Sequence, residues 1–299
     1  EIKMVEDTPE DILSEVFTKA FYPKHALGLP IEGTRKTVRT FNHETTRNFH
    51  AKTFQPQNIV IACAGNVEHS QIVELSKKFF NQKSEIRNQK SEDEVSAVPH
   101  SSAPILIKAK KNLEQAHLII AAPWISSADE RRYAASLLIG ILGDGNSSRL
   151  WQTIREKHGL AYSVGASANS FEDCGVFSIY AGCSPEKLLQ VVDLAIDEMC
   201  RIKREGVTPE ELNLAKEQTI ASVLLGLEDS SVRAANLAQM EITHGRQISV
   251  EETLAKIQAV SVEEIREIAR EFFRTEQIAL AALGNLNGLK IRRERLEVS

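Results

Sequence analysis

An internal repeat constrains the fold of this 299-residue chain more than any other feature of its sequence. Residues 54–67 and 273–286 both read as a helix end, a short turn, an apolar run and then Gly-Asn with an apolar residue after it. The spacing from Phe to Gly is the same in both, and the offset is 273 − 54 = 219 residues. Self-similarity of this kind indicates that one structural unit occurs twice. A chance match of one strand is the alternative explanation.

The two copies differ in how much sequence precedes them. About 110 residues, from the region of Ile105 to Glu217, come before the second copy and have no counterpart before Glu1. Residues 1–22 align instead with the helical region 217–242. The chain opens at Glu1 without methionine and runs straight into a helix signal at Thr8-Pro9. We therefore expect the first half to lack roughly a hundred residues at its front.

Hydrophobic periodicity and capping signals predict an α+β protein. The expected helices are 9–22, 44–54, 67–80, 127–142 and 148–157, and the region after residue 184 reads as mostly helical, with capping boxes that begin at Thr208 and Ser261. The expected strands are 58–65, 105–109, 117–121, 161–171, 175–182 and 277–283. The predicted fold is two homologous α/β-sandwich halves with a mainly antiparallel sheet packed with helices, the first half incomplete.

Residues 81–103 are polar, charged and poor in large apolar side chains, which is typical of a linker. We therefore expect residues 1–80 to be the C-terminal part of a first domain. Residues 104–299 are expected to form the second domain.

Charge and cysteine content exclude several classes of protein. The chain has 36 Lys and Arg against 41 Asp and Glu, a formal charge of −5, which argues against nucleic-acid binding. No apolar run approaches the length of about 18 residues needed for a membrane span. Four cysteines without Cys-x-x-Cys spacing favour a reducing compartment over a disulfide scaffold.

The sequence contains no complete zinc site. A helical site needs two ligands three or four residues apart, and none of the eight histidines has a histidine partner at that spacing. His43 and His50 are seven residues apart, which separates them by about 10 Å of helical rise. They are therefore interpreted as solvated surface side chains.

Residues 147–164 contain the most specific candidate for chemistry. Ser147 can cap a helix and Gly159 can end it. Arg155 lies near the end of this helix and Tyr162 at the start of the next strand, so the two could converge. A guanidinium and a phenol together suit a peptide carbonyl or an oxyanion. The alternative is a surface arginine that offsets the helix dipole and a tyrosine that packs.

At these residues the chain resembles the pitrilysin/insulinase family of zinc metallopeptidases, the inverzincins, in its bacterial processing-peptidase-like branch. The resemblance rests on residues 1–9 (EIKMVEDTP) with 27–34 (LGLPIEGT), on 58–67 and on 147–164. It extends over most of the chain and agrees with the duplicated α+β halves.

The resemblance implies a zinc site that the chain does not complete. In such proteins a His-x-x-Glu-His helix supplies two zinc ligands and the general base, and a later Glu is the third ligand. Glu1 matches that ligand by its place before Ile2-Lys3-Met4, with Glu6 as the second choice. Arg155 and Tyr162 match the pair that contacts substrate and stabilises the tetrahedral intermediate. The His-x-x-Glu-His helix is absent here and is expected upstream of Glu1.

Two functions follow from the resemblance. The first is the C-terminal two-thirds of a zinc endopeptidase that hydrolyses peptides or unfolded segments in a two-domain chamber, this chain alone being inactive. The second is a non-catalytic subunit that serves as scaffold or substrate binder for a zinc-bearing partner. The expected partners are a peptide or unfolded polypeptide and a missing N-terminal segment or catalytic partner, in a homodimer or heterodimer. The expected location is the bacterial cytoplasm, or the mitochondrial matrix in a eukaryote.

Overall fold

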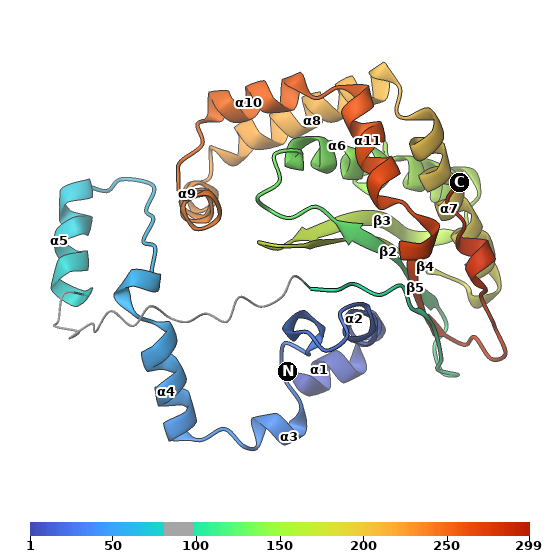
Figure 1. The fold of residues 1–299 in the computed structure, drawn as a ribbon, viewed down its shortest axis with the longest axis horizontal. Coiled ribbons are helices and arrows are strands. Elements are labelled where there is room, and N and C mark those ends of the chain that lie inside the picture. Colours follow the sequence, from blue (N-terminus) through green and yellow to red (C-terminus); the bar gives the residue numbers. More distant parts are fainter. Residues whose placement is uncertain (81–98) are drawn as a thin grey trace. The chain divides into compact units, whose positions relative to one another are not determined.

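The computed structural model describes residues 1–80 and 99–299 (Figure 1). Most of the predicted linker 81–103 therefore lies outside the described residues. The chain divides into two compact units, which are described separately. Of the described residues, the first contains 1–34, 99–219 and 253–299, and the second contains 35–80 and 220–252.

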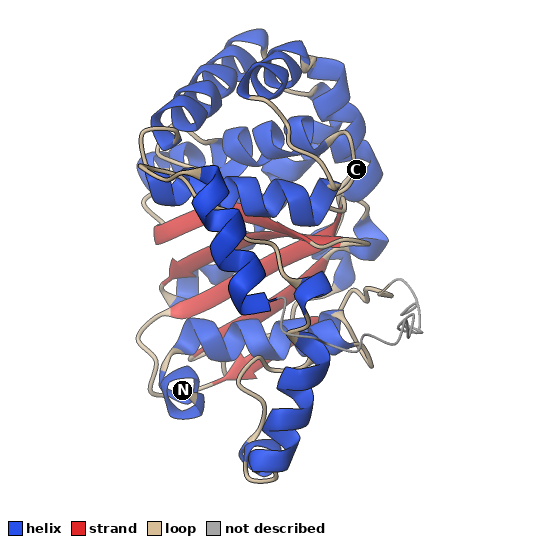
Figure 2. Cartoon of the chain, turned by 90° about the vertical axis from the view of Figure 1, so that its left-hand side faces the viewer, coloured by secondary structure: helices blue, strands red, loops and turns tan. Residues whose placement is uncertain are grey.

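The first unit is built on a five-stranded sheet in the order β1-β5-β2-β4-β3 (Figure 2). β1 and β5 are parallel, and the other neighbours are antiparallel. The strand bounds are β1 Ile105–Ala109, β2 Ala116–Trp124, β3 Ala161–Ser170, β4 Gly175–Cys183 and β5 Ala279–Gly284. The predicted α+β class and these five predicted strands are confirmed.

Helices cover both faces of this sheet (Figures 1 and 2). α6 (Arg132–Gly143), α7 (Leu188–Glu205) and α11 (Val262–Phe272) pack on one face, and α2 (Pro9–Phe21) contacts β2 and β5 on the other. α8 (Pro209–Gly226) and α10 (Val250–Ala259) continue across the boundary between the two units. The short helices of this unit are α1 (Ile2–Asp7), η1 (Ala26–Gly28), η3 (Trp151–Lys157), η4 (Pro185–Lys187), η5 (Thr275–Gln277) and η6 (Arg293–Leu296).

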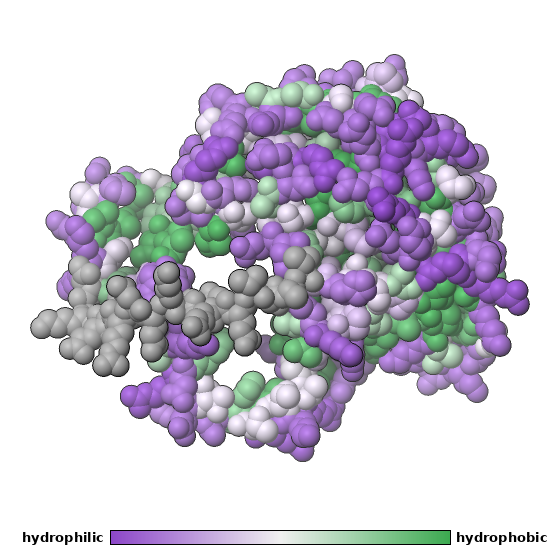
Figure 3. Space-filling model, viewed as in Figure 1, coloured by the Kyte–Doolittle hydropathy of each residue, from purple (hydrophilic) through white to green (hydrophobic). Residues whose placement is uncertain are grey.

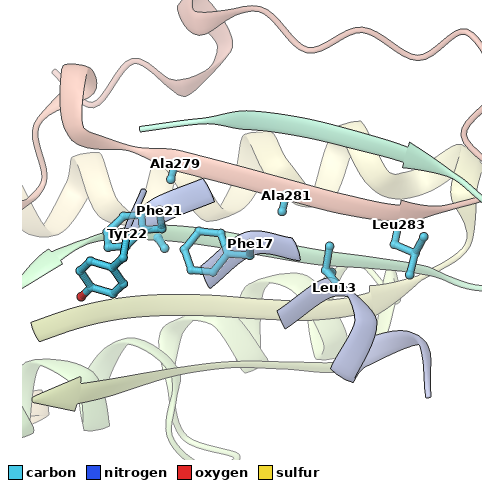
Figure 4. Packing of buried hydrophobic residues seen from close by; sticks show 8 residues of the cluster. Leu13, Phe17, Phe21, Tyr22, Ala279, Ala281 and Leu283 are labelled. Atoms are coloured by element: carbon cyan, nitrogen blue, oxygen red, sulfur yellow. The ribbon is translucent and has the colours of Figure 1, made fainter. Parts of the chain in front are cut away.

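α2 is held on the sheet by one apolar stripe (Figure 4). Leu13, Phe17 and Phe21 recur every four residues along α2, so they share one face of the helix. They pack against Ala279, Ala281 and Leu283 of β5, which alternate along the strand and so share one face of the sheet. Because each such side chain contributes about 1.5–3 kcal/mol when fully buried, this contact binds residues 1–34 to the sheet.

The second unit contains α3 (Arg35–Val38), α4 (His43–Thr53), η2 (Pro56–Asn58), α5 (His69–Phe80) and α9 (Ser230–His244). The predicted strand 58–65 is wrong in this structure. Val60 and Ile61 are 41% and 47% exposed, and no described strand pairs with them. The apolar run indicates that the segment tends to be buried. A strand forms only when a neighbouring segment makes hydrogen bonds with its N–H and C=O groups. Figure 3 shows apolar surface at this segment and α5.

The two copies of the internal repeat have matching backbone elements. α4 and α11 start and end at the same offset, since 262 − 43 and 272 − 53 are both 219. Each has a side-chain cap one residue earlier: Asn42 accepts from the Thr45 N–H at 2.9 Å, and Ser261 accepts from the Glu264 N–H at 3.2 Å. The 3-10 turns η2 and η5 follow at the same offset. The copies diverge only after these turns, because β5 has partner strands and residues 60–65 have none among the described residues.

Candidate functional site

Arg155 lies between two aromatic rings. Its guanidinium carbon is 4.1 Å from the ring centre of Trp151 and 5.0 Å from that of Tyr162. One Nη group also donates a hydrogen bond to the Tyr162 carbonyl oxygen. Cation–π contacts of this kind hold a guanidinium in a fixed plane. The structure therefore brings together the two residues that the sequence predicted could converge.

The helix that carries Arg155 is η3, a π-helix. Leu150 and Ile154 are completely buried and fix one side of it. Gly159, with a φ of +58°, ends the helix in the left-handed region, which confirms its prediction as a helix stop. Two N–H groups past the end, those of Gly159 and Leu160, donate to the carbonyls of Arg155 and Ile154 at 3.0 Å each. The π form was not predicted, and π-helices occur frequently at functional sites.

Tyr162 stands at a β-bulge. Ala161 pairs with Cys183 while Ser163 pairs with Gly182, so Tyr162 is the extra residue on its strand. A bulge redirects the side chain it carries. Tyr162 is 76% exposed, which leaves its hydroxyl free to donate outward. The strand thus presents a phenol beside the guanidinium of Arg155, and both can donate to a carbonyl oxygen.

A partly buried polar network lies behind the same helix, and sequence reasoning missed it. Arg149 donates from Nε and Nη2 to the two carboxylate oxygens of Glu211 at 2.7 Å each and to the Gly206 carbonyl at 3.2 Å. Glu198 of α7 is 2% exposed and accepts from the Thr153 hydroxyl at 3.0 Å. A cavity of about 330 Å³ adjoins these residues. The only signal in the sequence was the Thr208–Glu211 capping box, which is confirmed by both of its hydrogen bonds.

This network shifts the pKa of Glu211. Burial alone raises the pKa of the carboxyl, but the hydrogen bonds from Arg149 and Thr208 outweigh it, and the pKa is lower than the ordinary value. Glu211 is therefore held as a carboxylate that pairs with Arg149.

Glu1 and Glu6, the two predicted candidates for a zinc ligand, are both exposed at the ends of α1. A catalytic zinc ion needs three protein ligands. Within residues 1–80 and 99–299, no group of three or more His, Cys, Asp or Glu side chains could hold a metal ion. The described residues thus do not form a zinc site by themselves.

The sequence matches the family described as "Peptidase M16 inactive domain" over residues 40–219. It is 34% identical to an uncharacterized zinc protease of Streptomyces coelicolor over 91% of this chain and 60% of that protein. It is 35% identical to the uncharacterized zinc protease YmxG of Bacillus subtilis over 95% of this chain and 68% of that protein. The chain belongs to the peptidase M16 family, which confirms the resemblance to zinc metallopeptidases.

Solved structures confirm the fold. A peptidase M16 inactive domain from Pseudomonas fluorescens has a TM-score of 0.84 at 21% identity and covers 97% of this chain and 69% of its own. A chain of complex III from Candida albicans also has a TM-score of 0.84, at 18% identity, over 99% of this chain and 72% of its own. The chain spans 60% of the length of the Streptomyces relative. No helix among the described residues is long and apolar enough to cross a membrane.

Proposed function

We propose that this chain is the substrate-contacting, C-terminal part of a zinc-dependent endopeptidase that hydrolyses peptides or unfolded segments in a two-domain chamber. Residues 104–299 would form the second domain and residues 1–80 the C-terminal part of the first, with residues 1–34 packed on the sheet of the second. The names of the relatives, uncharacterized zinc proteases, support the reaction class. The geometry of Arg155 and Tyr162 is the observation that carries the proposal.

The proposed role of this chain is limited to its own residues. Arg155 and Tyr162 would bind the peptide backbone and donate to the oxygen on which negative charge develops, a form of stabilisation that acts through prearranged donors. The His-x-x-Glu-His helix is proposed to lie in the part of a longer protein outside these residues, and Glu1 to complete its zinc site. Since the Streptomyces and Bacillus relatives are bacterial proteins, the proposed location is the bacterial cytoplasm.

The test is peptide turnover by the full-length protein. Arg155→Ala and Tyr162→Phe should each lower kcat about 10²–10³-fold, the usual effect of removing one oxyanion donor. Arg270→Ala and Tyr133→Phe are the matched controls, because among the described residues Arg270 pairs with Glu263 at 3.4 Å and Tyr133 lies on α6, outside η3 and β3. Unchanged turnover in folded Arg155→Ala and Tyr162→Phe variants would rule out the assigned roles.

A second candidate is a non-catalytic subunit of the same fold, acting as scaffold or substrate binder for a zinc-bearing partner. It is favoured by the description of the matching family as an inactive domain and by the fold shared with a complex III chain. It predicts turnover only when that partner is present. Cleavage by the purified full-length protein alone, abolished by a chelator, would exclude it.

A further inference from the structure

Glu198 is a buried carboxylate that packing does not explain. Its Oε1 atom accepts hydrogen bonds from Thr153 at 3.0 Å and from Arg201 at 2.9 Å. Its Oε2 atom is buried and has no hydrogen-bond partner among the described residues. Burying a half-satisfied carboxylate costs free energy. Departures of this kind from the rules of stable packing are expected where a residue serves a function.

The hydrogen bond from Thr153 reaches the middle of the π-helix that carries Arg155. Thr153 is two residues from both Trp151 and Arg155, so it lies on the opposite side of η3 from the stacked pair. The start of the same segment is held by the contacts of Arg149 with Glu211 and Gly206. Polar contacts to α7 and α8 therefore fix one side of this helix while the other side presents Arg155.

Side-chain contacts of this kind can favour the π form of the segment over the ordinary α-helix. The π form is rare, and the ordinary α-helical hydrogen bonding is available to the same residues. Changing from one to the other would rotate Arg155 relative to Trp151 and Tyr162. The apolar contacts of Leu150 and Ile154 are non-directional and discriminate weakly between the two forms, whereas a hydrogen bond is directional.

We propose that Glu198 is a positioning residue, which acts through Thr153 to hold η3 in the π form and thereby keeps Arg155 between Trp151 and Tyr162. The effect of this arrangement on catalysis rests on the proposed function, but the arrangement itself can be measured without it. The proposal gives the buried carboxylate of Glu198 a role that neither family membership nor the capping signals assign.

The test uses Trp151 as a reporter in the 299-residue chain. Trp124→Phe removes the other tryptophan, so that the fluorescence comes from Trp151 alone. Arg155→Ala in this background defines the acrylamide quenching of an unstacked Trp151. Thr153→Val, which removes the hydroxyl at similar volume, should produce most of the increase in quenching that Arg155→Ala causes. Glu198→Met should do the same. Thr153→Ser keeps the donor and should leave the quenching unchanged.

A different outcome would overturn the proposal. If Thr153→Val and Glu198→Met lower the Tm but leave Trp151 quenching at the parental value, Glu198 has only a structural role. Should Glu198→Met fail to fold, Glu198→Gln keeps the acceptor and the volume and must retain parental quenching, while Thr153→Val still tests the contact. If Arg155→Ala leaves peptide turnover unchanged while Thr153→Val raises quenching, the proposed function fails and the positioning role stands.

Discussion

Arg155 and Tyr162 are seven residues apart, yet the guanidinium carbon of the first lies 5.0 Å from the ring centre of the second. Gly159 makes this approach possible because its left-handed conformation turns the chain between η3 and β3. The bulge at Tyr162 then directs the phenol outward. A helix end, a glycine and a bulge thus create one pair of donors from a single short segment.

The packing of α6 against β3 should limit what can replace Gly143. A Cβ atom at Gly143 would lie 2.3 Å from the backbone nitrogen of Ala166, whereas at Gly140 nothing lies within 4 Å. Overpacking of this kind costs about 1–3 kcal/mol, so Gly143→Ala should destabilise the chain by that amount. Gly140→Ala should stabilise it by about 0.8–1 kcal/mol, since alanine is the better helix former. Urea unfolding measures both, and equal effects would contradict the proposed contact.

Residues 1–34 should depend on Phe17 for their place on the sheet. Phe17 is 5% exposed against β5, so Phe17→Ala should lower the free energy of unfolding by about 3–5 kcal/mol. Phe41→Ala is the matched control, because Phe41 is 63% exposed and its loss should change stability by less than about 0.5 kcal/mol. Thermal unfolding measures the stability of both variants. Equal losses of stability in Phe17→Ala and Phe41→Ala would contradict this role of Phe17.

The pairing of Glu211 with Arg149 should make stability depend on pH in the acid range. Because the pKa of Glu211 is lowered on folding, the unfolded state binds the proton more tightly. The contribution is therefore complete above the unfolded pKa of about 4.3 and is lost as the pH falls through the folded value. At pH 7, Glu211→Gln should lower the free energy of unfolding below that of the parent. In acid, the free energies of unfolding of the variant and the parent should be closer together. An unaltered pH profile in Glu211→Gln would contradict the pairing.

Local patterns in the sequence predicted much of the fold. β1 has the predicted bounds, and the capping box at Ser261 forms as expected. The predicted start of α6 was too early, because the Asp129 carboxylate accepts the backbone N–H of Arg131 and forms a turn before the helix. Periodicity reports which residues tend to be buried, but it does not show such local competition.

The site was only partly predictable. Convergence of Arg155 and Tyr162 followed from a helix stop and a strand start within one segment. The contact of Thr153 with Glu198 joins residues 45 apart and depends on how α7 packs, which no local pattern reports. The segment 58–65 failed as a strand prediction for the same reason, since a strand depends on neighbours.

The central claim is that Arg155 and Tyr162 act on substrate as one unit, and a double-mutant cycle on kcat/KM of the full-length protein tests it most directly. Residues that act together lose most of their effect with the first substitution. We predict that Arg155→Ala combined with Tyr162→Phe lowers kcat/KM little further than either change alone. Fully additive losses, or no loss in any of the three folded variants, would contradict the claim.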